Sequence, residues 1–226
     1  MINQYIIYGE RHSGTKFLDK LINKNFLINK TTQFGHKHFF RPEHIFESES
    51  SIIAETLFLC IVRNPYDWLM SFHNERHHCG ISNANDIYRF LSKEWSSREP
   101  FLGPEILEDR HIYSNRRYKD VFELRSVKLN FLRYILPIYV DNYVFVRYED
   151  FIDATFVSLF IRNIQNRFHL ISKKEHIEKL DLRKKYYHKI NRDLLKYINQ
   201  KIDWKIEKNI GYQPVLDISE FSCPLD

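Results

Sequence analysis

Blocks of apolar and polar residues follow one another along this chain in a way that predicts alternating strands and helices. An apolar run at residues 5–8 is followed by a polar turn at residues 9–14. Residues 56–62 are apolar without a break, which fits a central parallel strand covered by helices on both faces. Residues 142–146 predict a further strand. Helical spacing of apolar residues begins after Gly14, at Phe17, Leu18, Leu21 and Ile22.

Proline and glycine residues indicate where other helices and strands are expected to begin or end. Residues 32–40 predict a short strand or extended edge that ends in two histidines and a lysine, and Pro42 is expected to break any regular element in residues 41–51. Residues 23–32, 98–113 and those after Gln213 read as irregular. The remaining helices are expected at residues 66–77, 86–95, 120–138, 149–168, 191–200 and 203–209, the last ending at Gly211.

Strands that alternate with helices predict an α/β fold, a three-layer domain with a parallel sheet flanked by helices. The 226 residues suit a single domain, residues 1–226, with an excursion at about residues 74–117. The chain is 43% hydrophobic and 15% aromatic, which excludes a disordered protein. Its net charge of +5 (34 basic minus 29 acidic residues) suits an anionic ligand without requiring nucleic acid.

The cysteine pattern and the lengths of the apolar runs bear on the cellular compartment of the protein. The three cysteines are widely spaced and form no C-x-x-C pair, which favours free thiols in a reducing environment. No leader is visible before the first strand, and the apolar runs are shorter than a membrane helix requires. We therefore expect a soluble, cytoplasmic protein with no membrane partner.

The turn at residues 9–16 carries the first candidate chemistry. A helix N-terminus offers main-chain N–H groups and a partial positive charge to an anion. Gly14 permits close approach of the backbone, and Arg11, Ser13, Thr15 and Lys16 add donors. A turn that only connects strand and helix is the structural alternative.

The same turn is close to a Walker A motif and differs from it in one respect. Gly9 and Gly14 have the G-x-x-x-x-G separation, but the next residues are Thr15 and Lys16 rather than Lys and Ser/Thr. The Mg²⁺-binding hydroxyl and the phosphate-binding lysine have exchanged places. This order favours phosphate binding without nucleoside triphosphate hydrolysis.

Other chemically active stretches also fall at expected strand ends, where α/β sheets bind their ligands. They are residues 36–38, residues 63–71 and residues 147–150. Arg63 at the end of one strand and Ser71 two turns into the next helix could bind a phosphate together. A surface arginine paired with a carboxylate is the alternative.

At these motifs the chain resembles the sulfotransferases. ERHSGTKFL is similar to their 5′-phosphosulfate loop, and IVRNPYDWLMSFH to their 3′-phosphate motif, in which a serine follows the arginine by eight residues. FVRYEDFI resembles the family's later strand-and-helix element, and the terminal DWKIEKNIGY resembles the close of many bacterial-type members. As a whole the chain resembles bacterial-type and viral-type soluble members. The matches occur in the family order over most of the chain. The resemblance implies a P-loop NTPase-like sulfotransferase fold.

The resemblance also implies an activity and a set of site residues. The activity is transfer of a sulfuryl group from 3′-phosphoadenosine 5′-phosphosulfate (PAPS) to a hydroxyl acceptor. His38 matches the family's catalytic base, with His36 and Lys37 as alternatives. The residues implied for the 5′ end of PAPS, its 3′-phosphate and its nucleotide are Arg11, His12, Ser13, Gly14, Thr15, Lys16, Phe17, Arg63, Ser71 and Tyr148.

The chain departs from the family pattern at two places. His12 stands where the family has a lysine on the leaving group, so that Arg11, Lys16 or a protonated His12 must supply the positive charge. The C-terminal glycine-and-lysine motif has no clear counterpart, and the basic residues 173–185 are either its substitute or a solvated face.

Sulfuryl transfer needs positioning and charge neutralisation, which cationic side chains and N–H groups can supply, so no metal is expected. His73 and His77 have a metal-ligand spacing near His78 and Cys79, but a solvated helix end is the default interpretation. The acceptor, a small molecule or carbohydrate, is expected to bind residues 74–117 and the loops around His38. A P-loop kinase or NTPase and a non-catalytic nucleotide-binding module are the competing hypotheses, and the oligomeric state stays open.

Overall fold

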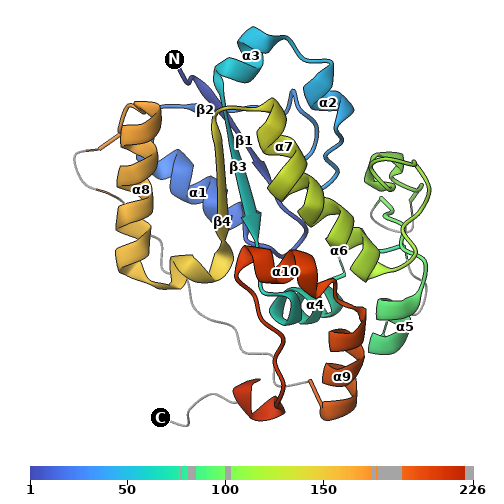
Figure 1. Ribbon diagram of the computed structural model, residues 1–226. Coiled ribbons are helices and arrows are strands. Elements are labelled where there is room, and N and C mark those ends of the chain that lie inside the picture. The colour runs from blue at the N-terminus through green and yellow to red at the C-terminus, as the bar shows by residue number, and fades with distance from the viewer. Residues whose placement is uncertain (77, 81–84, 100–102, 175–176, 178–189, 222–226) are drawn as a thin grey trace. The chain divides into compact units, whose positions relative to one another are not determined.

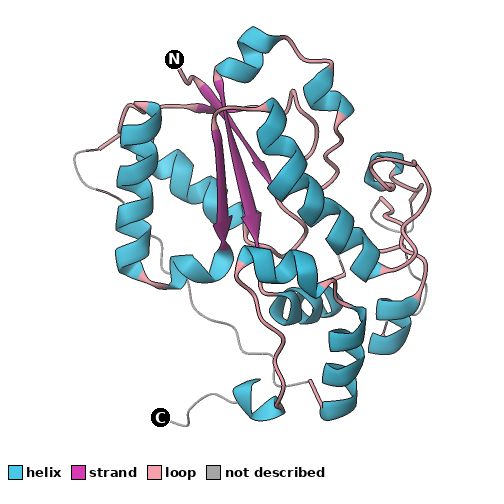
Figure 2. Ribbon diagram, viewed as in Figure 1, coloured by secondary structure: helices cyan, strands magenta, loops and turns pink. Residues whose placement is uncertain are grey.

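Four parallel strands and the helices around them make this an α/β protein (Figures 1 and 2). The computed structural model describes residues 1–76, 78–80, 85–99, 103–174, 177 and 190–221. Contacts divide the chain into two compact units. Unit 1 is Met1–Arg63 with Phe131–Lys184, and unit 2 is Asn64–Asn130 with Lys185–Asp226. The prediction of one domain with an excursion stays a prediction, and the excursion at 74–117 falls within unit 2.

The sheet belongs to unit 1 and has the strand order β2-β1-β3-β4, with every neighbouring pair parallel. All seven residues of β3 are buried, which confirms the predicted central strand. Parallel pairing brings the carboxyl ends of the strands to one edge. The strands are β1 (Gln4–Tyr8), β2 (Asn29–Lys30), β3 (Thr56–Val62) and β4 (Tyr143–Arg147).

The two faces of the sheet are covered by different elements. Alternate residues of β1 and β3, among them Ile7 and Leu59, join a core with helices α1 (Thr15–Asn25) and α8 (Ala154–Phe168). On the other face the phenol of Tyr143 donates a hydrogen bond of 2.7 Å to the carbonyl of Leu132. Figure 1 shows α1 and α8 on one side of the sheet and α7 (Leu136–Tyr139) on the other.

The predicted edge at residues 32–40 is wrong. These residues form turns, and the strand beside β1 is instead the short β2, within residues expected to be loop. Gly35 has a left-handed φ of 89°, and Phe34 and Phe40 are fully buried. Burying the side chains of Phe34 and Phe40 is more favourable in free energy than pairing this segment as an exposed edge strand. The chain therefore turns here and buries both rings.

Pro42 does not break the segment that follows it. It stands directly before the short helix α2 (Glu43–Phe46), and a second short helix, α3 (Ser50–Ala54), precedes β3. Proline is tolerated at a helix start because that position needs no N–H donor. The expectation of no regular element at 41–51 is therefore wrong.

The long helix expected at 120–138 is confirmed as three successive helical elements. They are α6 (Val121–Asn130), a π-helical turn (Phe131–Ile135) and α7. Pro137 has no N–H to donate to the carbonyl four residues earlier, which accounts for the change of helical type before it.

Unit 2 is helical around its own core. Helices α4 (Pro65–Asn74) and α6 supply core residues, as do α5 (Ile87–Ser92) and α9 (Arg192–Lys201). Gly211 ends α10 (Trp204–Ile210) with a φ of 99°, as predicted. Inside this unit Arg125 and Glu207 form a buried ion pair with Nη2 and Oε2 2.9 Å apart, and the guanidinium lies 4.9 Å from the centre of the Trp68 ring.

We expect Arg125→Met to lower the free energy of unfolding by about 3–5 kcal/mol, because it leaves the Glu207 carboxylate buried without its charge partner. Urea denaturation measures the loss. Arg116→Met, which breaks an exposed pair with Glu123, is the matched control and should cost far less. Equal losses from the two variants would contradict the importance of the buried pair.

Candidate functional site

The beginning of α1 differs from the beginnings of the other longer helices. Among the described residues, an Asn or Asp side chain accepts a main-chain N–H at the start of each of six helices. Helix α1 starts instead at Gly14, which has a left-handed φ of 98° and no side-chain cap. The six capping residues are Asn64, Asp86, Asp120, Asp153, Asn191 and Asp203.

The N–H groups at this open end have no hydrogen-bond acceptor. Within the described part of the chain, the main-chain N–H groups of Gly14, Thr15 and Lys16 make no hydrogen bond. The first hydrogen bonds of the helix come from Phe17 and Leu18, both to the carbonyl of Gly14 at 3.0 Å. Three successive unpaired donors at a helix N-terminus form an anion-binding arrangement.

The loop before the helix is closed by its own hydrogen bonds. Both the N–H and the hydroxyl of Ser13 donate to the carbonyl of Glu10, the former at 3.1 Å. The Ser13 hydroxyl, predicted as a ligand donor, is therefore engaged inside the loop. A side chain at Gly9 would come within 2.4 Å of the carbonyl of Ile61, so the loop needs glycine there to pass close to β3.

Arg63 and Tyr148 also lie against this loop. Arg63 Nη1 donates to the carbonyl of His12 at 3.1 Å, and its guanidinium carbon is 4.8 Å from the centre of the Tyr148 ring. A Cβ on Gly14 would lie 2.3 Å from that ring, so only glycine fits under Tyr148. The ring of Phe17 packs edge-on against Tyr148 at 6.4 Å. The structure thus brings together residues from the ends of β1, β3 and β4.

His38 is attached to the loop from the segment after β2. Its Nδ1 is 2.6 Å from the carbonyl of Gly9, and the N–H of Gly9 donates to the carbonyl of Lys37 at 3.1 Å. Because a carbonyl only accepts, Nδ1 carries the hydrogen and Nε2 carries the lone pair. Burial and the charge of Arg11 hold the pKa of His38 well below its usual value of 6.5. The imidazole is therefore neutral at neutral pH, with Nε2 as its proton-accepting atom.

Two lysines lie beside the loop that precedes α1. Lys16 is exposed and Lys37 is half-buried, and among the described residues neither ammonium group has an ion pair or hydrogen bond. Burial, with the charges of Lys30 and Lys16, lowers the pKa of Lys37. Lys30 is paired with Asp19 at 2.9 Å. Two lysines without counterions beside an open helix end attract an anion.

The other loop cation is already engaged. Arg11 is 2% exposed, pairs with Glu10 at 3.3 Å and lies 4.9 Å over the ring of Phe39. His12 has a left-handed φ of 62°, with its carbonyl turned to Arg63. Glu10 and Phe39 were not predicted as site residues; the aromatic pair that follows His38 in the sequence is the signal that could have found Phe39.

Ser71 is buried on α4 in unit 2, whereas Arg63 belongs to unit 1, and their joint binding of a phosphate remains a prediction. His73, His78 and Cys79 belong to no group of three possible metal ligands among the described residues, and His77 lies outside them. Most of residues 173–185 also lie outside the described part. No described helix is both long and apolar enough to cross a membrane.

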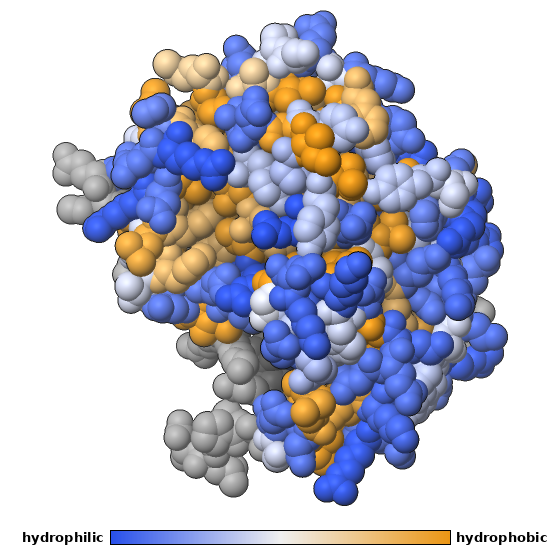
Figure 3. All heavy atoms as spheres, viewed as in Figure 1, coloured by the Kyte–Doolittle hydropathy of each residue, from blue (hydrophilic) through white to orange (hydrophobic). Residues whose placement is uncertain are grey.

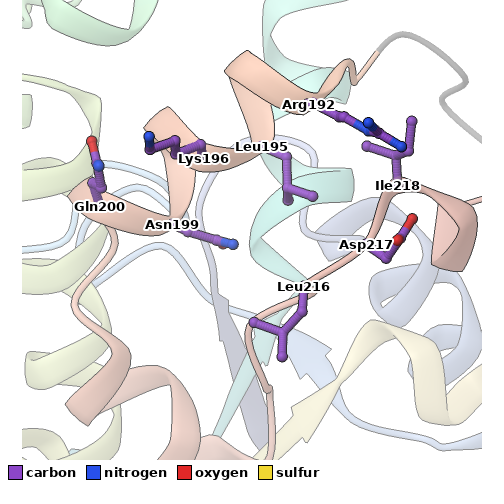
Figure 4. Close-up of a pocket in the computed structure, with 8 residues that line it drawn as sticks. All are labelled: Arg192, Leu195, Lys196, Asn199, Gln200, Leu216, Asp217 and Ile218. Atoms are coloured by element: carbon purple, nitrogen blue, oxygen red, sulfur yellow. The ribbon is translucent and has the colours of Figure 1, made fainter.

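Unit 2 contains a hollow of about 430 Å³ that holds none of the predicted site residues. Helix α9 forms one side of it and the segment after Val215 forms the other (Figure 4). Its lining residues are Arg192, Leu195, Lys196, Asn199, Gln200, Leu216, Asp217 and Ile218.

Comparison of this chain with protein-family models, curated proteins and solved structures found no match.

We expect the His38 imidazole to stay neutral down to a pH well below 6.5, because burial and the Arg11 charge disfavour the imidazolium. The unfolded chain takes up this proton near pH 6.5, so stability should fall as the pH drops below that value. ¹H–¹⁵N NMR of the ring nitrogens measures the pKa and the tautomer.

Two variants test the cause of this shift. Arg11→Gln and, to a smaller extent, Lys37→Gln should raise the pKa of His38, because each removes a repelling positive charge. Arg162→Gln removes an exposed charge from α8 and should leave the pKa unchanged. A pKa that does not rise in either of the first two variants would contradict the electrostatic account.

Proposed function

We propose that this protein transfers a sulfuryl group from PAPS to a hydroxyl acceptor, in a P-loop NTPase-like sulfotransferase fold. The observation that carries the proposal is the open N-terminus of α1, where three N–H groups and the Lys16 ammonium have no partner among the residues that the structure describes. The resemblance of the two phosphate motifs supplies the identity of the donor. The parallel sheet, with the loop at the carboxyl end of β1, supports the fold.

The residues present fit the phosphosulfate end of such a donor. The N–H groups of Gly14, Thr15 and Lys16 would bind the 5′-phosphate oxygens. The hydroxyl of Thr15, which makes no hydrogen bond within the described residues, adds a further donor. Arg63 would bind the 3′-phosphate together with Ser71, and Phe17 and Tyr148 would contact the nucleotide, as the resemblance implies. PAPS, when bound, supplies the sulfuryl group.

Lys16 is the cation that best replaces the missing loop lysine. Arg11 is buried against Glu10, and the backbone of His12 is turned to Arg63. Lys16 is exposed on the first turn of α1 and pairs with no described carboxylate. Its ammonium, with the adjacent N–H groups, would neutralise the charge that develops on the departing phosphate.

His38 is the proposed general base. Its hydrogen bond to Gly9 fixes the ring and leaves the lone pair on Nε2. Nε2 accepts the proton of the acceptor hydroxyl while the oxygen forms its bond to sulfur and the bond from sulfur to the phosphate oxygen breaks. The proton stays on His38, and the electron pair leaves with the phosphate, beside Lys16.

Calorimetric titration with adenosine 3′,5′-bisphosphate tests the binding part. We expect a micromolar affinity, about −8 kcal/mol, for the unmodified protein. Lys16→Gln should weaken binding about tenfold, because a hydrogen bond to a charged group is lost. Lys20→Gln removes the same charge one turn later on α1 and should have little effect. Equal affinity in both variants would rule out Lys16.

Transfer from radiolabelled PAPS to a panel of phenols, sugars and tyrosine peptides tests the chemistry. His38→Gln should lower the rate by about 10²–10⁴-fold with bisphosphate affinity unchanged, because the base acts only in the chemical step. A protein that binds the bisphosphate but transfers to no acceptor would be a non-catalytic nucleotide-binding module.

A further inference from the structure

A second hollow in unit 2, of about 310 Å³, is lined mainly by positive charge. It lies beside the C-terminal end of α5, where the surface is hydrophilic in Figure 3. Four cations and one carboxylate line it: Arg89, Lys93, Arg98, Arg117 and Glu94.

Main-chain contacts fix the walls of this hollow. The N–H of Gly80 donates to the carbonyl of Ser96 at 2.8 Å, and the N–H of Arg98 donates to the carbonyl of His78 at 3.0 Å. A Cβ on Gly80 would come within 2.4 Å of the Ser96 hydroxyl, so the two segments pass as closely as glycine allows. Asp86 caps α5 through the N–H of Arg89 at 2.7 Å. The backbone that positions the cations is therefore held in place.

The two carboxylates nearest the hollow, Glu94 and Glu105, are both paired with arginine. Arg117 pairs with Glu94 at 3.1 Å and with Glu105 at 2.6 Å. A hydrogen bond from Arg117 lowers the pKa of Glu105 to about 2; burial opposes this shift, and a hydrogen bond from Arg110 adds to it. Glu105 therefore stays ionised, and among the described residues Glu94 and Glu105 form no ion pair with the other cations that line the hollow.

The remaining cations lack counterions. Among the described residues, Arg89 and Lys93 make no ion pair, and Arg98 has only a 3.5 Å contact to the carbonyl of Gly103. Arg89 lies on α5 and Lys93 is the residue directly after it, four positions along the chain, and like charges this close repel each other. The Ser96 hydroxyl makes no hydrogen bond in the described structure and adds a neutral donor.

We propose that this hollow binds a tetrahedral oxyanion, the sulfate or phosphate group of a free ion or of a monoester. Guanidinium, ammonium and hydroxyl donors match the several acceptor oxygens of such a group, and binding relieves the repulsion among the cations. The site goes beyond the proposed transfer activity and does not depend on it.

The hollow shown in Figure 4 offers a contrast. It also contains cations, but Arg192 lies near Asp217, whose pKa is lowered by hydrogen bonds from Ser219 and by the charge of Arg192. Its positive charge is thus partly neutralised within the protein. Arg192→Gln is therefore a matched control for Arg98→Gln, and Lys205→Gln, an exposed site on α10, for Lys93→Gln.

The test is ¹H–¹⁵N NMR of the full chain, titrated at constant ionic strength with sodium sulfate, sodium phosphate, glucose 6-sulfate, glucose 6-phosphate and glucose. We expect saturable shifts of the Gly80, Ser96 and Arg98 amides with the anions and none with glucose. Arg98→Gln and Lys93→Gln should each weaken binding about fivefold, while the two control variants should not.

The outcomes separate this inference from the proposed function. Tighter binding of the monoesters than of the free ions assigns the site to an esterified ligand, and equal binding assigns it to the ion. Shifts confined to Gly14, Thr15 and Lys16 would overturn the inference while supporting the transfer site. Equal weakening in all four variants would also overturn it, because it would report bulk charge rather than a pocket.

Discussion

The helix that begins at Gly14 without a cap is the constraint on which the account of this protein depends. A helix leaves its first N–H groups without internal partners, and the other longer helices here satisfy one of them with an Asn or Asp side chain. At α1 the left-handed glycine turns the chain so that no side chain does this. These donors have no partner among the described residues, which is the basis of the proposal that they bind a phosphate group.

The surrounding residues hold this arrangement in place. Arg63 holds the carbonyl of His12, Tyr148 lies on the bare Cα of Gly14, and the segment at Lys37 and His38 is hydrogen-bonded to Gly9. Each contact helps to fix the backbone of the loop that leads into α1. The arrangement has a local electrostatic cost, because Lys16 and Lys37 lie near each other and neither has a counterion among the described residues. A local rule broken in this way is typical of a functional site.

Much of this was predictable from the sequence because it follows from local periodicity and punctuation. The buried run at Thr56–Val62, the strand and helix around Gly14, and the cap at Gly211 all came from short stretches of sequence. The turns at 32–40 did not, because burial of Phe34 and Phe40 against the sheet overrides the strand propensity of the segment.

The inner arrangement of the site was also beyond sequence reasoning. Nothing in the sequence shows that the Ser13 hydroxyl closes the loop or that Arg63 reaches a carbonyl 51 residues away. Arg89 and Arg98 read as ordinary surface charges until the pairing of residues 78–80 with 96–98 places them in one hollow. Such contacts depend on the tertiary fold. The identity of a residue shows which hydrogen bonds and charge interactions it is able to form, but not which partners it has.

A crystal structure of the protein with adenosine 3′,5′-bisphosphate tests the central claim most directly. The account predicts the 5′-phosphate oxygens within hydrogen-bond distance, about 2.7–3.2 Å, of the main-chain nitrogens of Gly14, Thr15 and Lys16. It would be contradicted by a nucleotide bound elsewhere while these N–H groups bind only water.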